Sequence, residues 1–501
     1  MKNLNITLLF MCALLAISCT KEETIITEEE QQHQEIAKKE PLSIQEINAI
    51  IEATLKTSGE FNWSAVDDYT LWSGVVQGNN ILTVGYGNKG ESFSETRSQR
   101  LLDQKDVIVN VVETFEGAQR NKENYIDHEV INVIDVKVEN IETITALRQQ
   151  TGVRYLEPSG YNHFEIAQRS SSGCDKNADS IDPTHYATVV PNNAQVSWHF
   201  YEHNIPQAWN VSTGAGITVG LIDTGVSQSQ SLLNESGFND GYSNGRYVQK
   251  YGTFIDSYWW WSNNYDGPHD KCGHGTAMAS TIVAPRNDNG MPVGVAYNSN
   301  LVAYRATEDV LLNDYHERKG VSEALIQLAN RNDVKIISMS IGYLWSIGNI
   351  EDAIKYAYSK GKLIFAAGGT STDFTNAYGV IFPASMNETV AVTGVNDGDA
   401  YERCDTCHSG SEIDFTIIMQ GKNNTSKAPP VLNFYNNQRR YTGGSSVATA
   451  TTAGIAALVW SRYPSWSRAQ VVNRLKQSSE FYPNRNSNFG YGNIDALQAV
   501  Q

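Results

Sequence analysis

Short apolar runs alternate with longer amphipathic stretches from Ile205 to the C-terminus. Apolar runs bounded by turn residues are typical of buried strands, and apolar residues recurring every three to four positions are typical of helices. The expected strands are residues 217–222, 301–305, 334–340, 362–367 and 389–395, and the expected helices include residues 321–330 and 350–359. This alternation predicts an α/β fold of three layers, in which a parallel sheet carries helices on both faces.

A different pattern occupies residues 41–160. Ser43 and Glu46 have the spacing of a capping box, and apolar residues follow at helical spacing, so a helix is expected from Ile44. Strand-like runs follow at residues 81–86, 107–113 and 130–138, then a helix at 141–149 and a last strand at 153–158. These elements predict a small α+β domain that precedes the sheet domain.

The first forty residues have no pattern of a folded core. Residues 1–19 combine a basic start with a short apolar run, which is typical of a secretory signal rather than a membrane helix. The ending at Cys19 resembles a bacterial lipoprotein signal, in which Cys19 would be lipidated; an ordinary cleaved signal is the alternative. Residues 20–40 are an acidic polar tether. We therefore expect an exported protein, lipid-anchored in the bacterial envelope at the cell surface or facing the periplasm.

Composition limits the partners. The chain has 501 residues, 41% hydrophobic and 19% charged, which suits two or more globular domains. A net charge of −17 argues against nucleic acid as a partner. Residues 161–200 form a polar connection, and we expect a maturation cut there, with residues 168–171 as an exposed candidate site.

Three glycine-rich turns bring an acid, a histidine and a serine into the sheet domain. The strand at 217–222 ends on Asp223, His274 opens a helix of small residues, and Ser446 opens a helix with almost no charge, which should be buried. An activated serine needs a base to take its proton and an acid to orient that base. Each residue alone also has a structural interpretation, as a strand-end acid, a buried histidine or an N-cap serine.

Together these stretches resemble the signatures of the subtilisin-like serine proteases, whose triad follows the same chain order. They are Asp223-Thr224-Gly225, Gly273-His274-Gly275-Thr276 and Gly444-Ser445-Ser446-Val447-Ala448. The resemblance implies a serine endopeptidase domain at residues 201–501, with Asp223, His274 and Ser446 as the triad. It also implies that residues 41–160 are a propeptide of a self-processed zymogen, with a permanent binding or spacer domain as the alternative. The expected partners are a protein or peptide substrate, the chain's own propeptide and, through the lipid, a membrane.

The resemblance also assigns residues around the serine. Ser340, Ile341 and Gly342 would pair with the substrate backbone and form one wall of the S1 pocket; Ala367 and Gly368 would form the other, with Ile381 narrowing its floor. The asparagine that normally supplies the second oxyanion donor is replaced by Gly369. Thr370 or a backbone N–H near Gly369 is the candidate substitute. An inactive surface-binding protein that keeps the fold is the alternative function.

Four cysteines lie beyond the N-terminal segment: Cys174, Cys272, Cys404 and Cys407. An even number in an exported chain favours disulfides, and Cys174 is a candidate partner for Cys272. Cys404, Cys407 and His408 match the c-type haem attachment pattern, with a bound metal, a local disulfide or free thiols as alternatives. We expect no cofactor. Structural calcium stays open, because relatives often bind it, but no ligands are assigned.

Overall fold

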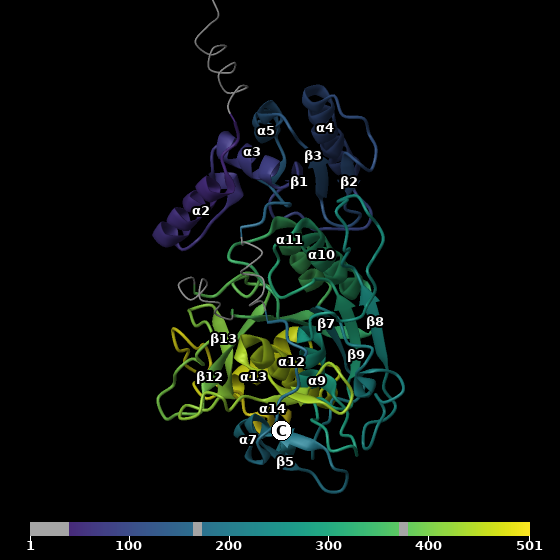
Figure 1. The fold of residues 1–501 in the computed structure, drawn as a ribbon, viewed down its shortest axis with the longest axis vertical. Helices are drawn as coiled ribbons and strands as arrows, with labels where there is room; N and C mark the ends of the chain where they lie inside the picture. Colours follow the sequence, from purple (N-terminus) through teal and green to yellow (C-terminus); the bar gives the residue numbers. More distant parts are fainter. Residues whose placement is uncertain (1–39, 164–172, 370–378) are drawn as a thin grey trace, which may run out of the picture. The chain divides into compact units, whose positions relative to one another are not determined.

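The computed structural model describes residues 40–163, 173–369 and 379–501, and residues Pro41–Gln501 form one unit (Figure 1). Cys19, Thr370 and the candidate maturation site at 168–171 lie outside the described residues. Over the residues that are described, no helix combines the length and the apolar character needed to cross a membrane.

The N-terminal part is built on a four-stranded antiparallel sheet in the order β2-β3-β1-β4. Its strands are β1 (Ile81–Tyr86), β2 (Tyr125–Asp127), β3 (Val133–Lys137) and β4 (Val153–Glu157). Its helices are α2 (Ile44–Ser58), α3 (Asp68–Gln77), α4 (Gln99–Glu116) and α5 (Ile141–Arg148), with a 3₁₀ turn, η1, at Trp63–Ala65. The predicted capping box is present, since Ser43 and Glu46 exchange side-chain and backbone hydrogen bonds at the start of α2.

One predicted element in this part is wrong. Residues 107–113, expected as a strand because they are rich in valine and isoleucine, lie inside helix α4. Leu101, Ile108 and Val112 are buried on one face of that helix, whereas Val107 is exposed. The burial therefore follows the helical period, and the side chain of Ser98 caps the helix by accepting from the N–H of Leu101.

The C-terminal part contains a seven-stranded sheet in the order β13-β12-β11-β10-β7-β9-β8, and every neighbouring pair is parallel. The strands are β7 (Thr218–Asp223), β8 (Val248–Gly252), β9 (Asn300–Arg305), β10 (Val334–Met339), β11 (Leu363–Ala367), β12 (Val390–Asn396) and β13 (Ile413–Gln420). Successive side chains along these strands enter opposite cores, as Leu221 and Ile222 do. This is the predicted parallel sheet with helices on both faces.

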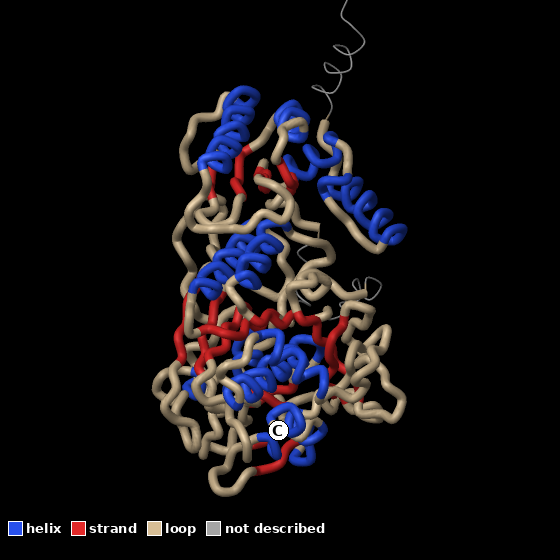
Figure 2. Tube along the Cα trace, turned by 180° about the vertical axis from the view of Figure 1, so that it is seen from behind, coloured by secondary structure: helices blue, strands red, loops and turns tan. Residues whose placement is uncertain are grey.

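Two groups of helices cover the two faces of this sheet (Figure 2). Helices α9 (His274–Val283) and α12 (Gly444–Arg462) pack in one core, and α10 (Tyr315–Asn330) and α11 (Gly348–Ser359) pack in the other. The second core continues into the N-terminal part, where it includes Leu82 and Leu156. The two parts therefore share one apolar interior.

Smaller elements complete the sheet domain. They are η2 (Pro183–His185), β5 (Tyr186–Thr188), β6 (Gln195–Ser197), α7 (Trp198–Glu202), α8 (Ile205–Ala208), η3 (Ser231–Leu233), β14 (Pro430–Leu432), β15 (Arg439–Tyr441), α13 (Arg468–Gln477) and α14 (Ala496–Val500). Strands β5 and β6 pair antiparallel, as do β14 and β15.

Candidate active site

Asp223 ends strand β7 in the middle of the sheet, where its side chain is fully buried. Its Oδ1 atom accepts a hydrogen bond from the N–H of Thr224 at 2.8 Å and contacts Nδ1 of His274 at 2.7 Å. His274 is the first residue of α9 and is only 5% exposed. The structure thus joins two of the three predicted residues across a buried hydrogen bond, and a carboxylate there fixes the imidazole tautomer with the proton on Nδ1.

Asp270 organises the turn that carries His274, and sequence reasoning missed it. Its carboxylate accepts from the backbone N–H groups of Cys272 and Gly273, both at 2.8 Å, and from the hydroxyl of Thr276 at 2.6 Å. It also accepts from the hydroxyl of Thr224 at 2.9 Å, which ties the Asp223 turn to the His274 turn. An acid just before a glycine-rich helix start is the signal that could have indicated this role.

Ser446 lies in the first turn of α12, and its side chain is half-buried. Gly444, with φ +74°, makes the turn into the helix. The hydroxyl of Ser340 donates to the backbone carbonyl of Ser446 at 3.0 Å, which anchors the turn on the end of β10. His274 contacts Asp223 at the end of β7, and Ser446 contacts Ser340 just after β10. Helices α9 and α12 therefore both begin beside the carboxyl edge of the sheet, where ligands of parallel sheets bind.

The two predicted walls of the S1 pocket are joined through Ile381. The N–H of Ile381 donates to the carbonyl of Gly368 at 3.0 Å. A Cβ atom added to Gly342 would lie 2.9 Å from Cδ1 of Ile381, so the isoleucine side chain reaches the opposite wall. Ala367 is 6% exposed, and the N–H of Gly368 is bonded to Val392 of β12. Ile381 therefore lies between the walls.

Gly369 has no side chain to stabilise an oxyanion, and His408 lies against it. The φ of Gly369 is +126°, and a Cβ added there would overlap the His408 ring, at 2.9 Å from its Cγ atom. The ring is buried; its Nδ1 donates to the carbonyl of Gly379 at 2.6 Å, and burial lowers the pKa of His408. The neutral imidazole thus carries its proton on Nδ1 and has none left on Nε2 to offer an oxyanion.

Two disulfides account for the four cysteines. Cys174 is bonded to Cys272, two residues before His274, and Cys404 is bonded to Cys407. The second bond uses both sulfurs that covalent haem attachment would need. In the described part of the chain, no group of three or more His, Cys, Asp or Glu side chains could hold a metal ion, so we assign no calcium ligands.

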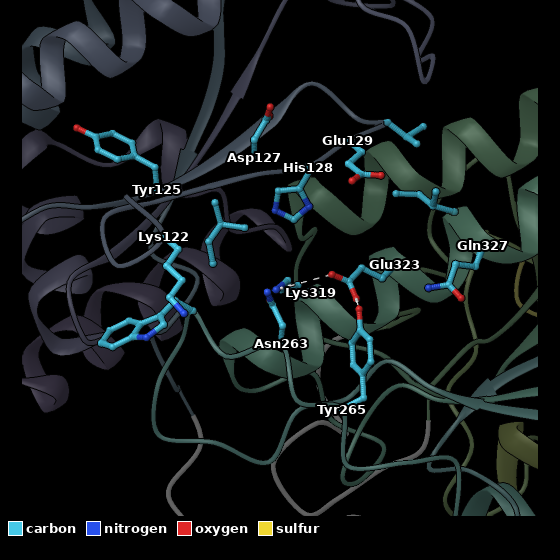
Figure 3. A pocket seen from close by; sticks show the side chains of 14 residues that line it. Lys122, Tyr125, Asp127, His128, Glu129, Asn263, Tyr265, Lys319, Glu323 and Gln327 are labelled. Carbon is cyan, nitrogen blue, oxygen red and sulfur yellow. Dashed lines mark hydrogen bonds and ion pairs between the residues drawn. The ribbon is translucent and has the colours of Figure 1, made fainter. Parts of the chain in front are cut away.

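A polar cavity of about 470 Å³ lies between the N-terminal part and α10 (Figure 3). In it, Glu323 accepts from the hydroxyl of Tyr265 at 3.0 Å and lies 3.8 Å from the ammonium of Lys319. None of its lining residues belongs to the predicted triad. We assign it no part in serine chemistry.

Comparison with known proteins places this geometry in a family. The profile of the Subtilase family, Peptidase_S8, matches residues 214–492. The thermostable alkaline protease of Halalkalibacterium halodurans is 29% identical over 328 residues, which cover 65% of this chain and 79% of that protein. Subtilisin of Bacillus pumilus is 30% identical over 290 residues, covering 58% of this chain and 92% of that protein.

A solved structure agrees at the level of the fold. Fervidolysin from Fervidobacterium pennivorans, a keratinolytic enzyme related to subtilisin, matches with a TM-score of 0.58 and 17% identity. The match covers 84% of this chain and 61% of that chain. The chain therefore belongs to the subtilase family and is a subtilisin-like serine endopeptidase.

Proposed function

We propose that the chain hydrolyses peptide bonds through a triad of Asp223, His274 and Ser446. Ser446 attacks the scissile carbonyl, and Nε2 of His274 takes the serine proton and then gives it to the leaving amine. Asp223 holds the imidazole and stabilises its positive charge. The observation that carries this proposal is the buried contact of 2.7 Å between Nδ1 of His274 and Oδ1 of Asp223, which leaves Nε2 for the serine.

The oxyanion needs two donors in this mechanism. The backbone N–H of Ser446, in the first turn of α12, supplies one and adds the positive end of the helix dipole. Gly369 offers no side chain for the second, so a backbone N–H near Gly369 or the hydroxyl of Thr370 takes that place.

Residues 41–160 act as the propeptide of a self-processed zymogen in this proposal. Arg154 of β4 contacts the buried carboxylate of Asp352 in α11 at 2.9 Å, and Arg318 of α10 donates to the carbonyl of Ser159 at 3.0 Å. The hydroxyl of Tyr315 donates to Asp135 at 2.7 Å. These buried polar contacts, together with the shared apolar core, support a domain that packs on α10 and α11 until maturation.

Export and lipid anchoring rest on the sequence of residues 1–40. The basic start, the apolar run and Cys19 support a lipoprotein signal, and the acidic residues 20–40 support a tether between the lipid and the folded unit. The envelope location follows from these features.

A fluorophosphonate probe and the variant Ser446→Ala test the triad. The matured enzyme should be labelled at Ser446, because only an activated serine reacts with the probe. Ser446→Ala should lose labelling and peptidase activity and should leave the purified precursor uncut. Normal maturation of that variant in pure form would exclude self-processing.

Gly369 favours one rival function, an inactive surface-binding protein that keeps the fold. The rival predicts a folded chain whose Ser446 is not labelled and whose peptide turnover is absent. Labelling without turnover of any peptide would place the defect after activation of the serine, at the oxyanion donors.

A further inference from the structure

The substrate edge at Gly342 is occupied by the chain itself. The N–H of Gly342 donates to the carbonyl of Val310 at 3.0 Å, and its carbonyl accepts from the N–H of Leu312 at 3.2 Å. Leu311 and Gly342 form a parallel bridge. A substrate that adds as a strand uses the same backbone groups. It therefore cannot pair with Gly342 while residues 310–312 stay in place.

Residues 310–312 are held firmly at both ends. The carboxylate of Glu317, in the first turn of α10, accepts from the N–H of Glu308 at 3.3 Å and from that of Asn313 at 2.8 Å. Leu312 is fully buried, and Asn313 is 1% exposed. This segment is thus built into the fold, and its departure requires a change in what lies over it.

Gly173 lies over this segment and over the catalytic imidazole. A Cβ atom added to Gly173 would stand 3.5 Å from Cδ2 of His274 and 3.6 Å from a methyl group of Val310. The next residue, Cys174, is bonded to Cys272 in the His274 turn. Gly173 is therefore next to both the imidazole and Val310, and Val310 is bonded to Gly342 at the substrate edge.

Further contacts fix the residues that follow Gly173. The carbonyl of Asp175 accepts from Arg440, and that of Lys176 accepts from Nδ2 of Asn433 at 3.0 Å. A Cβ at Gly273, whose φ is +99°, would overlap the carbonyl of Asp175, so the two backbones touch. The segment 173–176 is bound along the His274 turn by covalent and hydrogen bonds.

We propose that residues 173–176 and 310–312 form a latch over the substrate edge, and that the Cys174–Cys272 disulfide keeps the latch closed. The proposal rests on the proposed function, because the latch regulates access to the Ser446 site. A cut anywhere before Gly173 leaves Gly173 attached to Cys272 through Cys174. Maturation by cleavage alone therefore does not open the edge to an extended substrate.

Opening the latch requires reduction of that disulfide. A thiolate of a dithiol attacks one sulfur of the Cys174–Cys272 bond and forms a mixed disulfide, releasing the other cysteine. The second thiol of the dithiol then attacks the mixed disulfide and releases the remaining cysteine. The dithiol is oxidised to a disulfide, and Cys174 and Cys272 each gain one electron and one proton to become thiols. The freed segment 173–176 keeps only its hydrogen bonds, and residues 310–312 lose their cover.

Matured enzymes, freed of the N-terminal part, are assayed on two substrates to test the latch. The Cys174→Ser/Cys272→Ser variant is compared with wild type and with Cys404→Ser/Cys407→Ser, which removes the other disulfide. One substrate is a tetrapeptide anilide that reaches Gly342, and the other is an ester of the same single P1 residue, which does not. The latch variant should raise kcat/KM on the tetrapeptide by about tenfold or more, as expected when two backbone hydrogen bonds no longer hold a closed state. Its kcat/KM on the ester should rise by less, because the ester has no backbone groups that pair with Gly342, so the tetrapeptide-to-ester ratio should increase.

A second measurement covers the case in which the latch variant fails to fold. The Cys404→Ser/Cys407→Ser enzyme has only the Cys174–Cys272 disulfide, so dithiothreitol opens that bond alone, and mass spectrometry counts the free thiols. The tetrapeptide-to-ester ratio should rise in step with reduction. A ratio that is unchanged when the disulfide is open overturns the latch.

Binding separates failure of the latch from failure of the proposed function. Ser446→Ala protein is first cut by an added protease in the connection before Gly173 and freed of the N-terminal part; a fluorescent tetrapeptide amide should then bind about tenfold more tightly once the disulfide is opened. Absence of fluorophosphonate labelling in every enzyme would reject the proposed catalysis, while peptide binding would still decide the latch. Equal peptide affinity with the disulfide closed and open would reject the latch alone.

Discussion

The variant Gly369→Asn restores the asparagine that the family places at the oxyanion, and the structure predicts that the restoration fails. Position 369 has φ +126°, a backbone conformation that favours glycine. A Cβ there would overlap the ring of His408. That ring is held in place, because its Nδ1 donates to the carbonyl of Gly379 and the backbone N–H of His408 donates to the carbonyl of Gly369.

The magnitudes decide the outcome. A side chain at such a φ costs about 1–3 kcal/mol, and extra atoms forced into a packed site cost about 1–3 kcal/mol more. The sum, about 2–6 kcal/mol, is a large part of the ~5–15 kcal/mol that stabilises a typical domain. The donor is worth about 2.7–4 kcal/mol of transition-state stabilisation in subtilisin, where its loss has been measured. That gain needs the amide to reach the oxyanion, and the His408 ring occupies its path.

Two assays check this prediction. Urea unfolding of the Ser446→Ala precursor should show that Gly369→Asn lowers the free energy of unfolding by at least about 2 kcal/mol. The matched control Gly361→Asn also has a positive φ, +83°, but no atom within 4 Å of the added Cβ, so it should cost only the backbone part, about 1 kcal/mol. In matured enzymes, kcat on a peptide ester should not rise in Gly369→Asn. It should rise by more than about tenfold when Gly369→Asn is added to His408→Ala. A stable Gly369→Asn enzyme with a raised kcat would refute the reasoning.

Three further predictions concern the pocket, the domain contact and the anchor. Ile381→Gly should widen the S1 pocket and raise kcat/KM for a tetrapeptide with Phe at P1 over one with Ala by about tenfold; an unchanged ratio would remove Ile381 from the pocket. Burial raises the pKa of Glu157, whose half-buried carboxyl accepts from the N–H of Gly348, to about 7 from an ordinary value of 4.5. The stability that protonated Glu157 gives the Ser446→Ala precursor is therefore complete below pH 4.5 and is lost as the pH rises to about 7, by about 1–3 kcal/mol. Urea unfolding should accordingly give a lower free energy of unfolding at pH 8 than at pH 5. That difference between the two pH values should shrink in Glu157→Gln. Cys19→Ala should move the protein from the membrane pellet to the soluble fraction, and retention in the pellet after a salt wash would contradict lipid anchoring.

The parallel sheet could be predicted from the sequence because its central strands are buried on both faces. Strand β10, for example, is buried at five of its six positions, so it stands out as a mostly apolar run. The edge strands did not stand out. Only Val248 of strand β8 is buried, and β13, at the other edge, mixes polar residues into its run. An edge strand has one neighbour, and its pattern is correspondingly weaker.

In the candidate active site, too, some residues could be predicted from the sequence and others could not. Asp223, His274 and Ser446 lie in turns whose glycines and small residues are visible locally. The partners of Gly342 and Gly369 are not. Val310 and His408 reach them from segments that are distant in sequence, and only the folded chain brings those segments together. Local patterns carry no information on such contacts, which is why residues 340–342 were expected to be free for a substrate.

The N-terminal part and the latch would oppose substrate entry by different physical means. Arg154 and Tyr155 both bond to the carboxylate of Asp352, and their contact belongs to an apolar core that continues into α10 and α11. A cut in the connection leaves these contacts intact, so release of the N-terminal part is an equilibrium that depends on buried area and on groups such as Glu157. The latch does not depend on that equilibrium, because Cys174 follows any cut made before Gly173 and stays bonded to Cys272 of the sheet domain. Raising the pH should therefore weaken the first barrier alone, and a dithiol the second alone. Full access to an extended substrate should need both, which is a requirement that neither a simple propeptide nor a simple disulfide switch would produce.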